Sequence, residues 1–281
     1  MLMDGGKYIF YDGAMGTMLQ KHGLKQGERP DIMNMTAPDV VESVHRAYVE
    51  AGSDIICANT FGANAQALST TGYSPREVIA AAVAIAKRAS GETAKVAIDI
   101  GPIGRLLEPI GDLEYSSAYE LFKEQAQTGE EAGADYAAIE TMSDITELKA
   151  AMLAVKENTN MPILATMTFN KSGYTYMGCS PEEFAQTAEE FGATAVGINC
   201  SLEPSEMYET MARIAKSTQL PLIVKPNAGL PDGATGLYSI GPEEFARQMA
   251  RFAEIGVRIV GGCCGTTPEY IKELRKIFTA L

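Results

Sequence analysis

The stretch "EAGADYAAIETMSDITELKAAMLAVKENT", residues 131–159, contains the unit from which the chain is built. A polar stretch ends in glycine, a short run rich in Ala and Ile follows, and a polar turn leads into a new pattern of helical period. Glycine after an amphipathic run is typical of a helix C-terminus, and Asp before such a run is a typical N-cap. The stretch therefore predicts the end of one helix, a strand at 135–142 and a second helix at 144–159.

This unit recurs along all 281 residues. Strands are predicted at 8–13, 54–61, 95–102, 135–142, 162–169, 194–200, 221–229 and 258–265. Helical stretches are predicted between these strands, for example at 37–52, 74–90, 116–133, 144–159 and 241–256, and a helix at 267–281 follows the last strand. Eight strand–helix units match an α/β fold of the TIM-barrel type, (βα)8, which typically has about 250 residues. No linker or low-complexity run divides the chain, so we expect one domain over residues 1–281.

A doubly wound open sheet is the alternative fold. Its first βα turn normally carries a GxGxxG phosphate fingerprint, which "DGAMGT" at 12–17 lacks, so the barrel is preferred. The long connection after the first strand, within residues 6–36, is expected to form a loop over the mouth of the barrel.

Charge and composition exclude several classes of partner. The net charge of −13 disfavours nucleic acid and anionic membranes. No apolar run approaches the roughly 18 residues of a membrane span, and the N-terminus lacks a signal-peptide pattern. A cytoplasmic globular protein without a membrane partner is expected.

Polar and thiol side chains gather where the predicted strands end. These residues are Asp12, Asn59, Asp99, Glu140, Cys200, Asn227, Cys263 and Cys264. A barrel places its active site at the carboxyl ends of its strands, so the group predicts a site there. Asp99 and Asn59 have an alternative role as caps of the following loop or helix.

Three of the five cysteines suggest a metal. Cys200 ends the sixth predicted strand, and Cys263 and Cys264 end the eighth, so a closed barrel would bring three thiols together. Three thiolates can hold zinc (Zn2+) with one ligand position open, which is typical of a catalytic site. Neither histidine competes, because His22 lies in the long first connection and His45 on a helix expected outside the barrel.

Other roles for the cysteines are weaker. A vicinal disulfide between Cys263 and Cys264 would be strained and disfavoured in a reducing cytosol. Cys57 and Cys179 are better explained as small buried apolar residues. That explanation fails for the adjacent pair, because neighbours in a regular strand cannot both point into one core.

The chemistry of a three-thiolate zinc favours a sulfur substrate. Such a metal is a poor Lewis acid for making hydroxide and a good site for another thiol, whose pKa it lowers below about 8.5. The expected reaction is alkyl transfer to a substrate thiol.

Seven motifs resemble one known family in order along nearly the whole chain. They are "DGAMGTMLQ", "ANTFGAN", "DIGPIG", "IETM", "GINCS", "PNAGLP" and "GGCCGTTPEYI". The chain resembles the homocysteine S-methyltransferase family and is most similar to the homocysteine-binding module of cobalamin-dependent methionine synthases. The resemblance implies a zinc-bearing TIM barrel that methylates homocysteine to methionine. It assigns the zinc ligands to Cys200, Cys263 and Cys264.

The resemblance also implies substrate contacts. Glu140 matches a carboxylate that receives the amino group of homocysteine, which is reasonable because a buried ammonium needs an anionic partner. Further contacts are expected from Asp12, Gly13, Ala14, Thr60 and Phe61. Asn227 is expected to pack against the site or to lend its amide oxygen to zinc.

The methyl donor stays open at this point. The chain contains no DxHxxG cobalamin motif. The methyl group would come from methylcobalamin on a separate corrinoid protein, which the motifs favour, or from a small donor such as S-methylmethionine or betaine. A different thiol substrate is a further alternative, and a zinc-thiolate binding or redox-sensing barrel is an alternative of another class.

Overall fold

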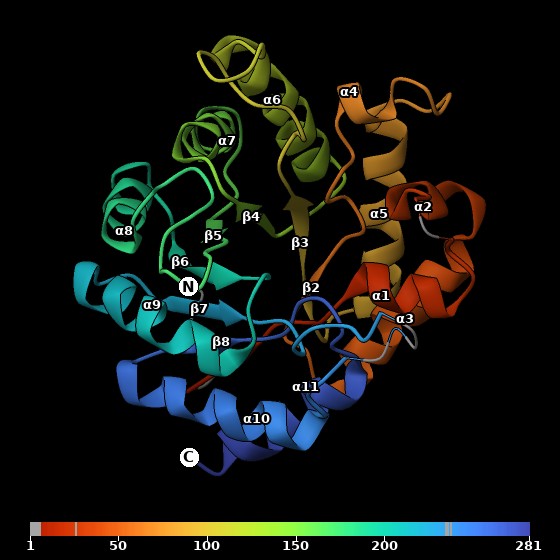
Figure 1. The fold of residues 1–281 in the computed structure, drawn as a ribbon. Helices are drawn as coiled ribbons and strands as arrows, with labels where there is room; N and C mark the ends of the chain where they lie inside the picture. The colour runs from red at the N-terminus through yellow and green to blue at the C-terminus, as the bar shows by residue number, and fades with distance from the viewer. Residues whose placement is uncertain (1–6, 26, 234–235, 237) are drawn as a thin grey trace.

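The computed structural model describes residues 7–25, 27–233, 236 and 238–281, and its parallel strands form a closed barrel (Figure 1). The strands are β1 (Ile9–Phe10), β2 (Ile55–Cys57), β3 (Lys95–Ile100), β4 (Tyr136–Met142), β5 (Ile163–Met167), β6 (Ala195–Asn199), β7 (Leu222–Lys225) and β8 (Ile259–Val260). They pair in the order β1-β8-β7-β6-β5-β4-β3-β2. A bridge between Tyr11 and Ile55 closes the ring, and the amide of Asp54 donates to the carbonyl of Phe10 at 2.7 Å. The predicted TIM barrel is confirmed.

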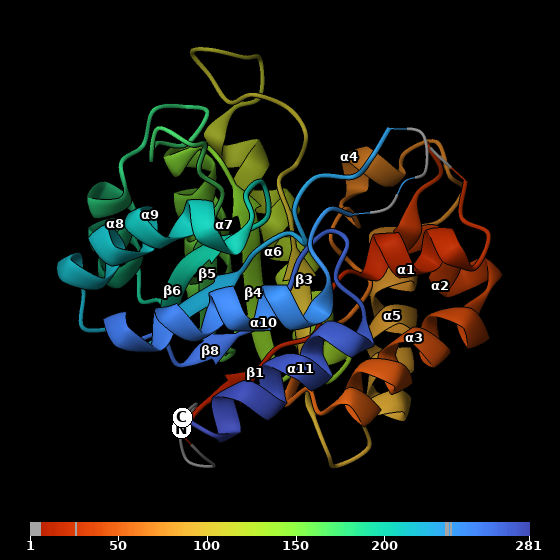
Figure 2. The same ribbon diagram turned by 60° about the horizontal axis from the view of Figure 1, so that its bottom comes forward.

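Helices surround the strands on the outside of the ring (Figure 1). Their bounds are α1 (Met15–Lys21), α2 (Met33–Thr36), α3 (Pro38–Ala51), α4 (Ala65–Leu68), α5 (Pro75–Ser90), α6 (Tyr115–Glu131), α7 (Ile145–Asn158), α8 (Pro181–Glu190), α9 (Pro204–Ser217), α10 (Pro242–Ala250) and α11 (Pro268–Thr279), with 3-10 turns η1 (Pro30–Ile32) and η2 (Arg251–Ile255). Consecutive helices pack side by side, as α10 and α11 do in Figure 2.

Local signals explain where the helices begin and end. Ser74 and Glu77 form a reciprocal capping box at the start of α5. Four glycines between a helix and the next strand adopt the left-handed conformation predicted from their position: Gly52, Gly133, Gly192 and Gly256, with φ of 99°, 96°, 90° and 87°. These helix ends were therefore predictable from the sequence.

Side chains along each strand point alternately to the outside and to the inside of the barrel, so the buried apolar residues form two cores. The larger core lies between the strands and the helices. The barrel interior holds a second apolar cluster that includes Ala97, Ala138 and Ile223. Two residues further along the same strands stand Asp99, Glu140 and Lys225, on the same face because side chains in a strand alternate. The interior is therefore apolar below and charged toward the carboxyl ends of the strands.

Two sequence-based expectations need correction. β8 ends at Val260, so Cys263 and Cys264 lie in the turn beyond the strand and do not end it. The connection after β1 is not a simple loop, because it contains α1, η1 and α2, although Gly13, Ala14 and Pro30 do line the cavity at the barrel mouth. Across the part of the chain that the structure describes, every helix is too short or too polar to cross a membrane.

Candidate active site

A cavity of about 380 Å³ lies at the carboxyl ends of the strands. Most residues predicted for the site line it: Asp12, Gly13, Ala14, Phe61, Glu140, Cys200, Cys263 and Cys264. Cys57, Asp99 and Lys225 line it as well. Thr60 and Asn227 are not in its wall. The hydroxyl of the buried Thr60 instead donates to the carbonyl of Asp99 at 2.8 Å, so Thr60 supports the wall from behind.

The three thiols of Cys200, Cys263 and Cys264 come together at this cavity. Their sulfur atoms all lie within 4.8 Å of one another, and the Cys200 and Cys264 sulfurs are 3.8 Å apart. Two thiolates on one tetrahedral zinc, with Zn–S bonds of about 2.3 Å, lie roughly 3.8 Å apart. The spacing and the all-sulfur donor set therefore fit zinc.

The turn that carries two of these thiols is held by the connection that follows β7. The amide of Cys263 donates to the carbonyl of Pro226 at 2.8 Å, and the carbonyl of Cys264 accepts from the amide of Ala228 at 2.9 Å. A Cβ on Gly262 would lie 2.3 Å from the Thr266 hydroxyl, so only glycine permits this packing. Both cysteines face the cavity because they lie in a turn, where the alternation of a strand does not apply.

Cys200 has a backbone conformation that residues other than glycine rarely adopt. Its φ is 61° and that of Ser201 is 58°, in the left-handed region. The amide of Cys200 donates to the carbonyl of Lys225 at 3.0 Å, and the hydroxyls of Ser201 and Thr168 are hydrogen-bonded. These contacts hold the strained turn that directs the Cys200 sulfur to the other two.

The thiols share negative charge unequally. Hydrogen bonds from Cys263 and Cys264 lower the pKa of Cys200 to about 3, although burial opposes the shift. The hydrogen bond to Cys200 raises the pKa of Cys264 to about 12 and also raises the pKa of Cys263. Ionisation of one thiol thus opposes ionisation of the other two, and a bound cation would relieve this opposition.

A further polar side chain near the three thiols is that of Asn227. Its side chain is 8% exposed, and its amide oxygen Oδ1 is buried without a hydrogen-bond partner among the residues described. A buried acceptor without a partner carries a desolvation cost, which a cation or a donor would relieve. A hydrogen bond from the Asn227 side chain lowers the pKa of Cys200, so this side chain lies beside the thiol cluster.

Beside the thiols lies a buried group of charges. Glu140 forms an ion pair with Lys225, whose side chain is 4% exposed. The Lys225 ammonium also lies 4.2 Å from the centre of the Tyr11 ring. Burial opposes the charge on Lys225, but Cys57 and Glu140 raise its pKa well above the usual range. We assign this mainly to Glu140, because burial raises the pKa of Cys57 and keeps that thiol neutral.

Two further carboxyl groups are not neutralised by lysine. Burial raises the pKa of Asp12 to about 7, although one oxygen accepts from the Cys57 amide at 2.8 Å. Burial and the charge of Glu140 raise the pKa of Asp99, whose Oδ1 has no hydrogen-bond partner within the described ranges. Three carboxyl groups thus face one ammonium, and the cavity can accept a second cationic donor.

Cys57, Asp99 and Glu140 form a second group with ligand atoms within 4.8 Å of one another. The Lys225 ammonium already lies there, paired with Glu140 and 4.0 Å from the Cys57 sulfur. Because lysine supplies the cation at this place, the three-thiol cluster is the better candidate metal centre.

Sequence reasoning missed Lys225 and Asn199. Lys225 stands at the end of the apolar run "PLIV", and a charged residue in a strand that is otherwise buried was a usable signal. Asn199, immediately before Cys200, is fully buried and hydrogen-bonded to Thr141 and Thr166. Nothing in the sequence distinguishes its role from that of an ordinary strand end.

Of the remaining candidates, Asn59 and Cys57 also line the cavity, whereas His45 and Cys179 lie outside it. Asn59 donates to the carbonyl of Pro30 at 2.7 Å and so ties β2 to the connection that contains α1 and α2. His45 is buried in α3, and Cys179 is buried away from the thiol cluster. Cys57 is buried as expected, but it faces the cavity.

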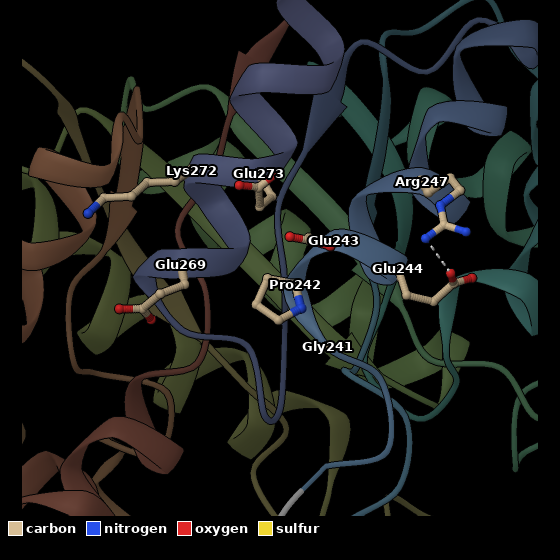
Figure 3. A pocket seen from close by; sticks show the side chains of 8 residues that line it. All are labelled: Gly241, Pro242, Glu243, Glu244, Arg247, Glu269, Lys272 and Glu273. Carbon is tan, nitrogen blue, oxygen red and sulfur yellow. Dashed lines mark ion pairs between the residues drawn. The ribbon is translucent and has the colours of Figure 1, made fainter.

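Another hollow, of about 490 Å³, lies on the outer surface between α10 and α11 (Figure 3). Its wall consists of Gly241, Pro242, Glu243, Glu244, Arg247, Glu269, Lys272 and Glu273. Arg247 pairs with Glu244 at 3.0 Å on the same helix. This wall contains no thiol and no buried charged side chain, so the barrel mouth is the candidate active site.

Comparison with known proteins agrees with this geometry. The family model described as homocysteine S-methyltransferase matches residues 9–278. The methionine synthases of Mycobacterium leprae (strain TN) and Mycobacterium tuberculosis (strain ATCC 25618 / H37Rv) are each 35% identical over 285 residues. Each match covers 94% of this chain and 24% of the relative, so the chain spans about a quarter of their length.

Solved structures of the homocysteine methyltransferase MmuM from Escherichia coli share the fold. The metallated form has a TM-score of 0.83 and the oxidized form 0.85, each at 22% identity with 98% of both chains covered. The family match extends from β1 to α11 and contains every residue of the cavity named above. The chain therefore belongs to the homocysteine S-methyltransferase family.

Proposed function

We propose that this chain binds homocysteine and presents its thiol for methylation, with methionine as the product. The observation that carries the proposal is the placement of three thiols within 4.8 Å of one another beside buried carboxyl groups in one cavity. Cys200, Cys263 and Cys264 would hold zinc, which lowers the pKa of a bound substrate thiol and so supplies a nucleophilic thiolate at neutral pH.

The residues beside the thiols suit the amino-acid end of the substrate. Glu140 is paired with Lys225, and burial raises the pKa of Asp12 and Asp99, so an ammonium group that binds beside these carboxyl groups would stabilise their charged form. Phe61, which is 41% exposed, lines the cavity and offers an apolar surface to the substrate side chain. The amide of Ala14 lines the same wall but already donates to Thr266 Oγ1 at 3.3 Å, so a substrate carboxylate would compete for it.

The methyl group comes, in this proposal, from methylcobalamin on a separate corrinoid protein or in a further part of a longer chain. The likeness of "DGAMGT", "NAGLP" and "GGCCGTTP" to the homocysteine-binding module of cobalamin-dependent methionine synthases supports this source. The chain corresponds to 24% of the length of the two mycobacterial methionine synthases, so such a protein has room for a further part that carries the donor. The alternative is a small donor such as S-methylmethionine or betaine that enters the cavity directly.

The test measures methionine formation by anaerobic, zinc-loaded protein. Homocysteine is supplied with free methylcobalamin in one reaction and with S-methylmethionine in another. Turnover with methylcobalamin supports the corrinoid proposal, whereas turnover only with S-methylmethionine replaces it with the small-donor alternative. Binding of zinc without methylation of homocysteine by either donor would contradict the proposed activity and favour a binding or redox-sensing role.

A further inference from the structure

Asn199, the last residue of β6, joins two parts of the site that are far apart in sequence. It is fully buried, and its side chain lies against Thr141, Thr166, Glu140 and Cys263. Its amide nitrogen Nδ2 is 3.4 Å from Glu140 Oε1 and 4.0 Å from the Cys263 sulfur. One side chain thus lies between the carboxylate expected to bind the substrate amino group and a thiol expected to bind zinc.

The orientation of the Asn199 amide follows from its partners. The backbone amide of Thr141 is 2.8 Å from Oδ1, and a backbone N–H can only donate, so the oxygen must face it. The Thr166 hydroxyl donates to the same oxygen at 2.9 Å. Nδ2 therefore points the other way, toward Glu140 and Cys263. The oxygen end holds only the scaffold, whereas the nitrogen end both donates to the Thr141 hydroxyl and faces the site.

The scaffold that Asn199 holds is strained. Thr141 follows Glu140 in β4 with a φ of 62°, a conformation that is rare for a β-branched residue. The pairing of β4 with β5 shifts register between Ile139 and Met142, which makes a bulge at Glu140 and Thr141. Asn199 binds both the amide and the hydroxyl of Thr141, each at 2.8 Å. The side chain of Asn199, at the end of β6, therefore holds the bulge in β4 that directs Glu140 into the cavity.

One hydrogen of the Asn199 amide group goes to the Thr141 hydroxyl, which leaves one for the site. The remaining hydrogen faces two acceptors, Glu140 Oε1 and the Cys263 sulfur. We propose that Asn199 is a positioning residue that sets Glu140 and Cys263 relative to each other through this hydrogen. The inference rests on the proposed function, in which Glu140 binds the homocysteine ammonium and Cys263 binds zinc.

Two variants separate the scaffold end from the site end. Asn199→Asp keeps an oxygen for the Thr141 amide and the Thr166 hydroxyl. It replaces the amide nitrogen, which faces Glu140 and Cys263, with an acceptor, to which the Thr141 hydroxyl can donate after rotation. Thr166→Val removes one contact at the scaffold end and leaves the amide nitrogen unchanged. Asn199→Ser, which lacks the amide donor and carries no charge, is tested as well in case the buried charge of Asn199→Asp prevents folding.

The first measurement is zinc affinity by competition with a chromogenic chelator, which needs no methyl transfer. Loss of a group that supports a metal ligand typically weakens metal binding about 10- to 100-fold, and we expect this for Asn199→Asp and Asn199→Ser. The second measurement is homocysteine binding to the cobalt-substituted protein, followed by thiolate-to-cobalt absorption. Homocysteine should bind about tenfold more weakly to the Asn199 variants, by loss of a charge-assisted hydrogen bond. Thr166→Val should keep wild-type values in both measurements.

The outcomes distinguish this inference from the proposed function. Wild-type protein that binds zinc but not homocysteine would contradict the proposed function, and zinc affinity would then test Asn199 alone. Unchanged zinc and homocysteine affinities in a folded Asn199 variant would overturn the inference. Equal losses in Thr166→Val would also overturn it, because the whole network would then act only as a scaffold.

Discussion

Lys225 carries a positive charge inside the barrel, and Glu140 balances it. The two side chains are 4% and 11% exposed, so each depends on the other for its solvation. Lys225→Met should lower the free energy of unfolding by about 3–5 kcal/mol, because it leaves the Glu140 carboxylate buried without its cation. Urea denaturation at neutral pH measures this change.

A second substitution supplies the control for Lys225. Glu140→Gln in the Lys225→Met background removes the stranded charge and should recover most of the lost stability. A double-mutant cycle of the two changes gives their coupling. Equal urea midpoints for the wild type and Lys225→Met would show that the ion pair contributes nothing to stability.

The sulfur of Cys263 lies in the three-thiol cluster, whereas the buried Cys179 lies outside the cavity. Cys263→Ser should greatly lower zinc content after dialysis and abolish methyl transfer, because a neutral hydroxyl is a poor ligand for a soft site. Cys179→Ser is the matched control and should retain zinc. Full zinc occupancy with wild-type turnover in Cys263→Ser would remove the cluster as the metal site.

Glu140→Gln tests the carboxylate by itself. It should weaken homocysteine binding, by about 1.5–3 kcal/mol for a charged hydrogen bond, and leave zinc bound. Isothermal titration with homocysteine and metal analysis of the same sample measure both effects. Loss of zinc together with homocysteine would place Glu140 among the metal ligands.

At the scale of secondary-structure elements, the first turn of α7 holds the connection between β3 and α6. Glu147 accepts from the amide of Ile103 at 2.7 Å and is 5% exposed. Burial raises its pKa to about 7, although this hydrogen bond opposes the shift. The folded state then binds more protons than the unfolded state between about pH 4.5 and 7, so this group makes stability fall as pH rises through that window.

Glu147→Gln should remove this pH dependence. The amide keeps an acceptor for Ile103 but carries no charge, so the free energy of unfolding should rise by at most about 3 kcal/mol near pH 8 and change little near pH 4.5. Urea denaturation at the two pH values measures it. Glu120→Gln, at an exposed carboxyl on α6, should have no such effect. A destabilised variant at pH 8 would show that the carboxylate itself holds the connection.

At the scale of the whole molecule, the three thiols proposed to bind zinc come from two connections of the barrel, one after β6 and one after β8. Zinc that binds only the folded state should stabilise the entire barrel, by about 2.7 kcal/mol when free zinc is 100 times its dissociation constant. The stabilisation should weaken as pH falls, because the thiols must lose their protons to bind.

Calorimetric melting with zinc and with a chelator measures this effect, with Cys263→Ser as the control that should not respond. Identical melting of the wild type in both conditions would mean that the cluster does not bind zinc in the folded protein.

The fold and most of the candidate site could be predicted because their signals are local. Helix caps, the glycines at helix ends and the repeated strand–helix unit depend on residues close in sequence. The convergence of Cys200 with Cys263 and Cys264 follows from strand order alone, once a closed barrel is assumed. The predicted strand at 258–265 was too long, because a glycine-rich turn continues the apolar run beyond Val260.

By itself, the sequence determined the barrel and the gathering of the three thiols at its mouth, because a regular alternation of strands and helices leaves few ways to pack. Only the tertiary structure decided which charged and polar side chains pair inside the barrel. Lys225 pairs with Glu140, which is 85 residues away in the sequence, and Asn199 lies beside Cys263, which is 64 residues away. Such contacts depend on strand register and on closure of the ring, which set distances that no short stretch of sequence encodes.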